Sequence, residues 1–211
     1  MKITKYGHSC LLIEEAGVCV LLDPGIFSAV PKDLPKVKAI LLTHEHADHT
    51  HPETLRRLWT ATPEARIITH LGVGTLLEQE GIAYELLNSG QTTEVETMRI
   101  TAVGREHASI VPEVLAVVNS GYLIGERLFT PGDSFTLPKR PVEILALPIV
   151  APWAKFAETR DYALAVKPKI VIPIHDGFLI PNNPYQFWIE KTMAEAGIAV
   201  KTLELGVATE F

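Results

Sequence analysis

The sequence predicts an α+β protein in which helices cover β-sheets. Short apolar segments of strand character outnumber the helical segments, and helices separate only some of them. One pattern also recurs along the chain: an apolar strand ends at a histidine or an aspartate. The residues are His44, His107, Asp133 and His175. Sites in such sheets lie beyond the carboxyl ends of the strands, so these side chains stand where a site is expected.

Each expected element has a local reason in the sequence. Two strands, 9–14 and 18–22, are joined by the turn Glu15-Ala16-Gly17. Prolines open the expected helices 52–60 and 184–196, while Gly81 ends helix 72–80 and Pro168 follows helix 155–167. We expect a loop at 26–38 and a turn at 90–93. Apolar or alternating runs predict the remaining strands, which are 39–43, 66–69, 82–86, 98–103, 114–119, 121–125, 127–130, 142–147, 169–174 and 198–205.

The composition favours one soluble globular domain that spans residues 1–211. The chain is 47% apolar and 21% charged, which is ordinary for this class. Its net charge is −6 and it has no basic stripe, so we expect neither nucleic acid nor an anionic membrane as a partner. The opening residues lack a long apolar segment, and the apolar run 144–154 is too short to span a bilayer, so we expect a cytoplasmic location. The two cysteines, Cys10 and Cys19, are expected to be buried free thiols.

The densest group of chemically active side chains is the stretch Thr43-His44-Glu45-His46-Ala47-Asp48-His49. It follows the apolar run 39–42, which is typical of a buried strand. His44 and His46 are two residues apart, so in an extended chain both rings point to the same side. Asp48 and His49 follow as the chain turns. A solvated polar turn is the alternative, but imidazole nitrogens and a carboxylate at a strand end are the donors that divalent metals need.

The stretch resembles the H-x-H-x-D-H signature of the metallo-β-lactamase superfamily. The segments that carry His107, Asp133 and His175 resemble the later metal-binding positions of that family, in order: Glu106-His107-Ala108-Ser109, Pro131-Gly132-Asp133-Ser134 and Ile172-Pro173-Ile174-His175. The opening Tyr6-Gly7-His8-Ser9-Cys10, with Asp23-Pro24, is similar to a small branch that contains ascorbate-6-phosphate lactonases. The resemblance implies a four-layered αβ/βα sandwich with the metals at one edge of two facing sheets.

The resemblance also implies a set of ligands for two divalent metal ions. The first ion would be held by His44, His46 and His107, the second by Asp48, His49 and His175, and Asp133 would bridge both. These donors suit zinc best, with manganese, iron or nickel as alternatives. Two ions ~3.5–4 Å apart would share a water and lower its pKa from ~15.7 toward neutrality, giving a hydroxide nucleophile. Asp48, Asp133 and His8 are the candidate catalytic residues.

Several further residues have open roles. His8 could touch the substrate or a metal-held water, or could be a satisfied structural residue. Asp23 is expected to brace a loop or a ligand histidine. Trp153 and Lys155 lie in a loop between Asp133 and His175 and could reach the metals, and Lys155 or Arg105 could meet an anionic substrate or remain solvated. His51 is expected to begin a helix, and His70 to be a polar residue at a strand edge.

We therefore expect a metal-dependent hydrolase that cleaves an ester, lactone or phosphoester bond of a small molecule, which could be anionic. The alternatives are a metal-dependent nuclease of the same superfamily, a di-iron oxidoreductase, and a non-catalytic metal-binding protein. Salt-dependent binding to RNA would favour the nuclease. Oligomerisation with further copies of the chain stays open.

Overall fold

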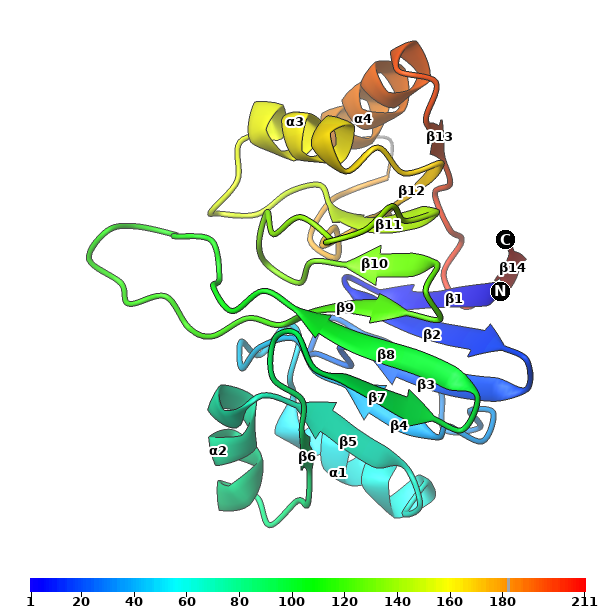
Figure 1. Ribbon diagram of the computed structural model, residues 1–211, viewed down its shortest axis with the longest axis vertical. Coiled ribbons are helices and arrows are strands. Elements are labelled where there is room, and N and C mark those ends of the chain that lie inside the picture. The colour runs from blue at the N-terminus through cyan, green and yellow to red at the C-terminus, as the bar shows by residue number, and fades with distance from the viewer. Residues whose placement is uncertain (182) are drawn as a thin grey trace.

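Two β-sheets pack face to face in the computed structural model, which describes residues 1–181 and 183–211 (Figure 1). Over these residues each sheet has seven strands, in the orders β14-β1-β2-β3-β4-β5-β6 and β13-β12-β11-β10-β9-β8-β7. The strands of the first sheet are β1 (Lys2–Gly7), β2 (Cys10–Glu15), β3 (Val18–Leu22), β4 (Ala39–Leu41), β5 (Arg66–Thr69), β6 (Glu85–Leu86) and β14 (Thr209–Glu210). Those of the second are β7 (Thr92–Val95), β8 (Met98–Val103), β9 (Gly121–Ile124), β10 (Leu128–Thr130), β11 (Ile144–Pro148), β12 (Ile170–Ile174) and β13 (Ala199–Val200).

Two helices cover the outer face of each sheet. The helices α1 (Pro52–Ala61) and α2 (Leu71–Gln79) lie on the first sheet, and α3 (Phe156–Val166) and α4 (Pro184–Glu195) lie on the second (Figure 1). Leu55 of α1 and Leu77 of α2 share one apolar cluster with Leu12 and Ile40. Tyr162 of α3 and Ile189 of α4 share another with Leu145 and Phe129. The expected four-layered αβ/βα sandwich is therefore confirmed.

The alternation along the strands explains why both faces of each sheet are buried. In β2, Leu11 and Ile13 point into the core between the sheets, while Cys10 and Leu12 point toward the helices. Because side chains alternate with a period of two, a strand buried on both faces reads as a continuous apolar run. Cys10 and Cys19 are both buried and free, as predicted, and the β2–β3 register places Cys19 opposite Glu14.

Some expected elements differ in the structure. The strand β1 was missed, because Lys2 and Lys5 obscure its pattern. The expected turn at 90–93 overlaps the polar edge strand β7. The expected strand 114–119 is wrong, since this segment belongs to a loop that projects from the body between β8 and β9 (Figure 1). Its Leu115 side chain is 93% exposed, so no sheet is present to bury it. The expected strand 198–205 is reduced to β13.

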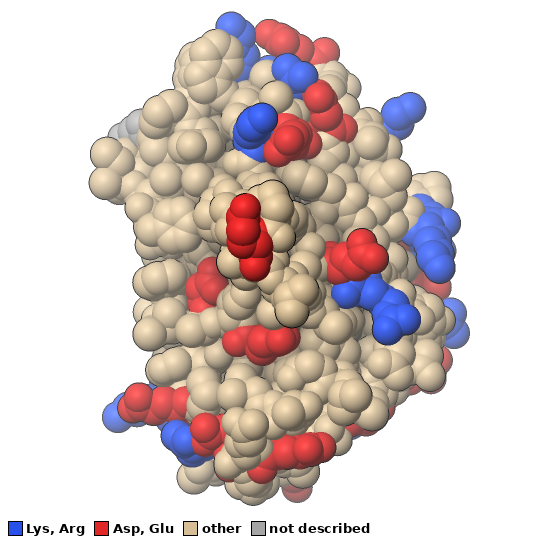
Figure 2. Space-filling view, turned by 90° about the vertical axis from the view of Figure 1, so that its left-hand side faces the viewer, with Lys and Arg blue, Asp and Glu red and all other residues tan. Residues whose placement is uncertain are grey.

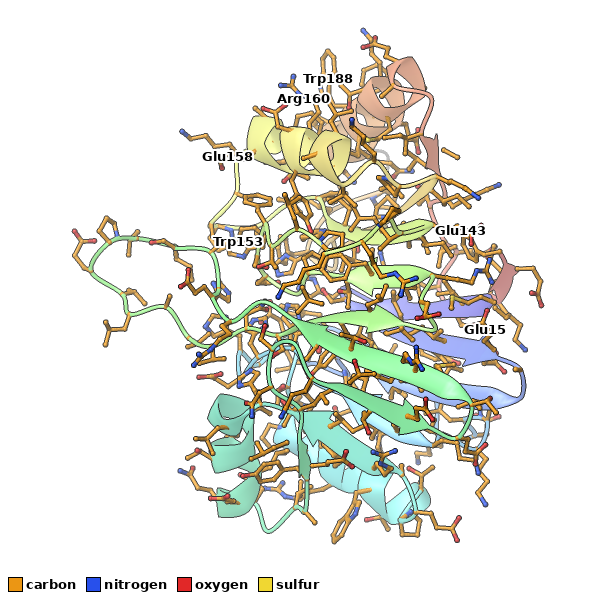
Figure 3. The ribbon with its side chains drawn as sticks, viewed as in Figure 1. Glu15, Glu143, Trp153, Glu158, Arg160 and Trp188 are labelled. Atoms are coloured by element: carbon orange, nitrogen blue, oxygen red, sulfur yellow. The ribbon has the colours of Figure 1, made fainter. Side chains whose placement is uncertain are left out.

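The end of the sandwich opposite the projecting loop is joined by ion pairs. Arg127 donates from Nη1 to Glu15 Oε1 at 2.9 Å and from Nε to Glu143 Oε2 at 2.7 Å. Figure 3 shows Glu15 and Glu143 at this end, away from the loop. The other end of both sheets therefore remains available for a site. None of the helices in the described part of the chain is long and apolar enough to cross a membrane.

Candidate metal centre

The seven predicted ligand residues lie together at one edge of the sandwich, beyond the ends of strands. His44 follows β4, His107 follows β8, Asp133 follows β10 and His175 comes directly after β12. Within each of three groups, the ligand atoms lie within 4.8 Å of one another. The groups are His44, His46 and His107; His8, Asp48, His49 and His175; and His44, His49 and Asp133. The first two groups match the two ligand sets implied by the sequence resemblance, with His8 added to the second, and the third links them.

A tight backbone turn presents the residues of the 43–49 stretch. The backbone N–H groups of His49 and Thr50 donate to the carbonyl of His46 at 2.9 and 2.8 Å, and Thr50 Oγ1 donates to the carbonyl of His44 at 2.7 Å. The segment around Gly25 crosses this turn so closely that a Cβ on Gly25 would lie 1.8 Å from the carbonyl oxygen of Asp48. Glycine at this position therefore permits the close approach of the two segments.

Asp23 fixes both the turn and one histidine ring. Its Oδ1 accepts from the backbone N–H of Thr43 at 2.8 Å, and its Oδ2 accepts from Thr43 Oγ1 at 2.8 Å. The same Oδ2 lies 2.8 Å from His49 Nδ1, and both side chains are 1% exposed. Asp23 thus braces a loop and a candidate ligand, as predicted. A carboxylate on the far nitrogen of a metal-binding histidine sets the tautomer and the orientation of the ring.

Two further histidines of the cluster are oriented by backbone carbonyls. His107 Nδ1 donates to the carbonyl of Ala108 at 2.6 Å, and His175 Nδ1 donates to that of Val150 at 2.7 Å. Because Nδ1 donates in both rings, the neutral form of each imidazole, which is the form that binds a metal, presents its lone pair on Nε2. Within the described residues, five buried atoms of the cluster have no hydrogen-bond partner of suitable geometry: Nε2 of His44, His49, His107 and His175, and Oδ1 of Asp133.

Buried polar atoms that make no hydrogen bond cost about 1–3 kcal/mol each, so a convergence of them calls for an explanation. Imidazole nitrogens and carboxylate oxygens aimed at one point are the donor set of a divalent transition-metal site. The residues present therefore fit the metal that the sequence predicted.

Asp133 lies between the two histidine groups. Its Oδ1 is 3.1 Å from His49 Nε2, and its Oδ2 is 3.0 Å from His175 Nε2 and 3.5 Å from His107 Nε2. The backbone N–H of Asp133 donates to Asn119 Oδ1 at 2.9 Å, which holds the aspartate in place. Asn119 was missed by the sequence analysis, because nothing in its local pattern marks it as a partner of Asp133.

Burial and neighbouring charges shift the pKa values of the histidines in the cluster in different directions. Burial opposes the charged form of His175, but the Asp133 and Asp48 carboxylates beside Nε2 outweigh it and raise the pKa of His175 to about 9. Burial also disfavours the charged form of His49, yet Asp133 and Asp23 raise its pKa. The pKa of His44 is lowered by burial and by the neighbouring His49. Without a cation, the neighbouring carboxylates therefore favour the protonated forms of His49 and His175.

His8 differs from the other histidines of the cluster. Its Nδ1 accepts a hydrogen bond from the backbone N–H of Gly177 at 3.1 Å, so the proton of the neutral ring is on Nε2. That Nε2 lies 3.2 Å from Asp48 Oδ2. Burial lowers the pKa of His8, which favours this neutral form. A protonated Nε2 has no lone pair for a metal, so His8 acts as a hydrogen-bond donor toward Asp48.

The remaining candidates have separate roles. Trp153 does reach the cluster, since its Nε1 donates to Asp133 Oδ2 at 2.9 Å. His70 is buried rather than exposed at an edge, because its Nδ1 accepts from Gly72 at the start of α2 and its Nε2 bonds the carbonyl of Thr43. His51 immediately precedes α1, as predicted. Arg105 lines a different cavity, next to His70.

Comparison with known proteins decides the family. Residues 2–175 match the family model described as the β-lactamase superfamily domain. The chain belongs to this superfamily. Protein Rv0786c of Mycobacterium tuberculosis is 35% identical over 187 residues, which cover 86% of this chain and 87% of that protein. A UPF0173 metal-dependent hydrolase of Methanocaldococcus jannaschii is 29% identical over 82% of this chain and 83% of its own length.

The structure of Igni18, a metallo hydrolase from Ignicoccus hospitalis, superposes with a TM-score of 0.78 at 22% identity. The superposition covers 100% of this chain and 98% of that one. This likeness supports the metallo-β-lactamase fold. Together with the relatives and the buried histidine–aspartate cluster, it identifies the protein as a metal-dependent hydrolase of that fold.

Proposed function

We propose that this superfamily member holds two divalent metal ions, zinc foremost, and hydrolyses an ester, lactone or phosphoester bond of a small molecule. His44, His46 and His107 would hold one ion, and Asp48, His49 and His175 the other, with Asp133 between them. The observation that carries the proposal is the convergence of these buried histidine and aspartate side chains at the edge of the sheets, where five of their nitrogen and oxygen atoms make no hydrogen bond of suitable geometry. When bound, such a pair of ions supplies a hydroxide nucleophile at neutral pH and polarises the oxygen under attack.

The protein's own residues prepare the site for this chemistry. Asp23 and the carbonyls of Ala108 and Val150 orient the histidine rings before any ligand binds. Trp153 donates to Asp133, and His8 donates toward Asp48, so both carboxylates are held in place. Groups that are positioned in advance need no reorganisation during the reaction, which is the main source of electrostatic catalysis.

The exposure of the side chains supports one direction of access. His44 and His49 are buried, whereas the Asp48 side chain is 24% exposed and His46 is half-buried. A substrate would therefore approach from the side of His46 and Asp48. No serine or cysteine nucleophile is needed in this scheme.

The test is hydrolysis before and after metal removal. Purified protein would be assayed on 4-nitrophenyl esters, lactones and bis(4-nitrophenyl) phosphate, then treated with a chelator and reloaded with zinc or manganese. We expect the chelator to abolish turnover, reloading to restore it, and His46→Ala to remain inactive under both conditions. Activity that survives metal removal would overturn the proposal. Turnover of none of these substrates by metal-loaded protein would favour the non-catalytic alternative.

A further inference from the structure

Two phenylalanine rings lie beside His8, on the Asp48 side of the metal centre. Phe27 and Phe178 are each 50% exposed, and their ring centroids are 6.3 Å apart. Both rings also contact the same buried imidazole, since the centroid of His8 is 5.5 Å from that of Phe27 and 5.3 Å from that of Phe178. Large apolar side chains left exposed together beside a reactive centre are typical of a binding surface.

The backbone fixes both rings relative to the centre. A Cβ on Gly7 would lie 2.5 Å from the carbonyl oxygen of Phe27, so the Phe27 segment packs directly on the residue before His8. The neighbouring Ile26 donates its N–H to the carbonyl of Ala47 at 2.8 Å. On the other side, the N–H of Gly177 donates to His8, and Phe178 follows. The backbone therefore holds both exposed rings in fixed positions beside the centre, and Phe27 and Phe178 together are called the aromatic wall below.

This wall has little positive charge around it. In the described part of the chain, no lysine or arginine lies within ion-pair distance of Asp48 or Asp133. Lys5, on β1, is 4% exposed, and its Nζ is 2.6 Å from Asp176 Oδ1. Figure 2 views the side that carries the projecting loop, and the lysines and arginines on this face lie toward the top, the right-hand side and the lower left. Among the described residues, Asp48 and Asp133 therefore bring no lysine or arginine to the centre to which a phosphate could bind.

We propose that Phe27 and Phe178 bind an apolar group of the substrate, aromatic or acyl, next to the bond that is cut. The inference rests on the proposed function and narrows it, because it assigns an ester or lactone with an apolar substituent rather than an anionic phosphoester. Both rings lie on the Asp48 and His175 side of the centre. Both contact His8, which lies next to Asp48, and the ring centroid of Phe178 is 5.9 Å from that of His175. The apolar group would therefore lie over this side.

Hydroxamic acids test the wall without knowledge of the natural substrate, because they bind metal through the same head group whatever their tail. Calorimetric titration of zinc-loaded protein would compare acetohydroxamic acid with phenylacetohydroxamic acid. Since a benzyl group buries apolar area, we expect the phenyl compound to bind about 10-fold tighter or more. In the double variant Phe27→Ala/Phe178→Ala, this ratio should fall to about 2 or less, while acetohydroxamic acid binds as before.

Phe187→Ala is the matched control, since Phe187 is similarly exposed, at 59%, but lies on α4. It should leave the ratio unchanged. Unchanged acetohydroxamic acid binding shows that the double variant keeps its metal centre. Equal affinity of the two compounds for the wild type, or an unchanged ratio in the double variant, would overturn the inference alone. Failure of zinc-loaded protein to bind either compound would overturn the proposed function, and the inference with it.

Discussion

Trp153 Nε1 lies 2.9 Å from Asp133 Oδ2, so an indole N–H donates to the carboxylate at the middle of the histidine cluster. Trp153 comes from the loop between β11 and α3, and its ring is 8% exposed. Its centroid is 6.0 Å from that of His107 and 6.2 Å from that of His175. One side chain thus orients Asp133 and covers two candidate ligands.

Trp153→Phe should weaken metal binding and hydrolysis without unfolding the protein. The phenyl ring keeps much of the packing but removes the donor, and outer contacts of this kind are worth about 10–100-fold in metal affinity or activity. The measurements are competitive zinc titration and turnover at saturating zinc. Trp188→Phe is the control, because Trp188 is 46% exposed on α4, far from Trp153 (Figure 3). An equal effect of both substitutions would argue against a role for the indole N–H.

Asp23→Asn should lower the affinity for the metal ion on the His49 side of the centre. The amide can present an N–H to His49 Nδ1, which would move the ring proton toward Nε2 and remove the metal-binding lone pair. We expect affinity for one of the two ions to fall by about 10–100-fold. Stepwise metal titration with elemental analysis measures this, and Asp33→Asn, at an exposed position, serves as the control. Two unchanged binding steps would show that Asp23 has only a structural role.

His8→Asn should retain both ions and reduce turnover. Asparagine tolerates the positive φ of 43° at this position better than most residues, so the backbone should be preserved. The substitution alters the donor toward Asp48, and we expect kcat to fall by about 10-fold or more. Metal content and kcat are measured on the same sample, with His51→Asn as the control. Loss of one ion instead would mean that His8 is a ligand.

Metal binding should release protons, and its affinity should rise with pH. The pKa of His175 is raised to about 9 and that of His49 is also raised, so in the metal-free protein both rings carry protons at neutral pH. A metal ion must displace these protons, which changes the apparent affinity by about tenfold per pH unit for each proton displaced. Affinity should therefore fall as the pH is lowered from 9.

Titration in buffers of different ionisation enthalpy measures the protons released. The same shift predicts that His175 stabilises the metal-free fold below its unfolded pKa of 6.5, and that this stabilisation is lost as the pH rises through 9. Metal affinity that is constant between pH 6 and pH 9, with no proton release, would contradict the assignment of protons in the cluster.

The sequence predicted the site better than its surroundings. Alternating runs such as Met98–Val103 carry a local signal for strands, and the resemblance to the H-x-H-x-D-H signature named the seven candidate ligands, which the structure brings together. Asn119 and Phe178 carry no such signal, because each acts through a residue that is distant in the chain and lies in a loop. The apolar run at 114–119 misled for the same reason, since only the tertiary structure decides whether a strand has neighbours.

The most direct test of the central claim is the anomalous scattering of a crystal grown with zinc. Two peaks are predicted, one on each side of the Asp133 carboxylate, with His44, His46 and His107 around the first and Asp48, His49 and His175 around the second. A single peak, or two peaks that Asp133 does not separate, would contradict the account.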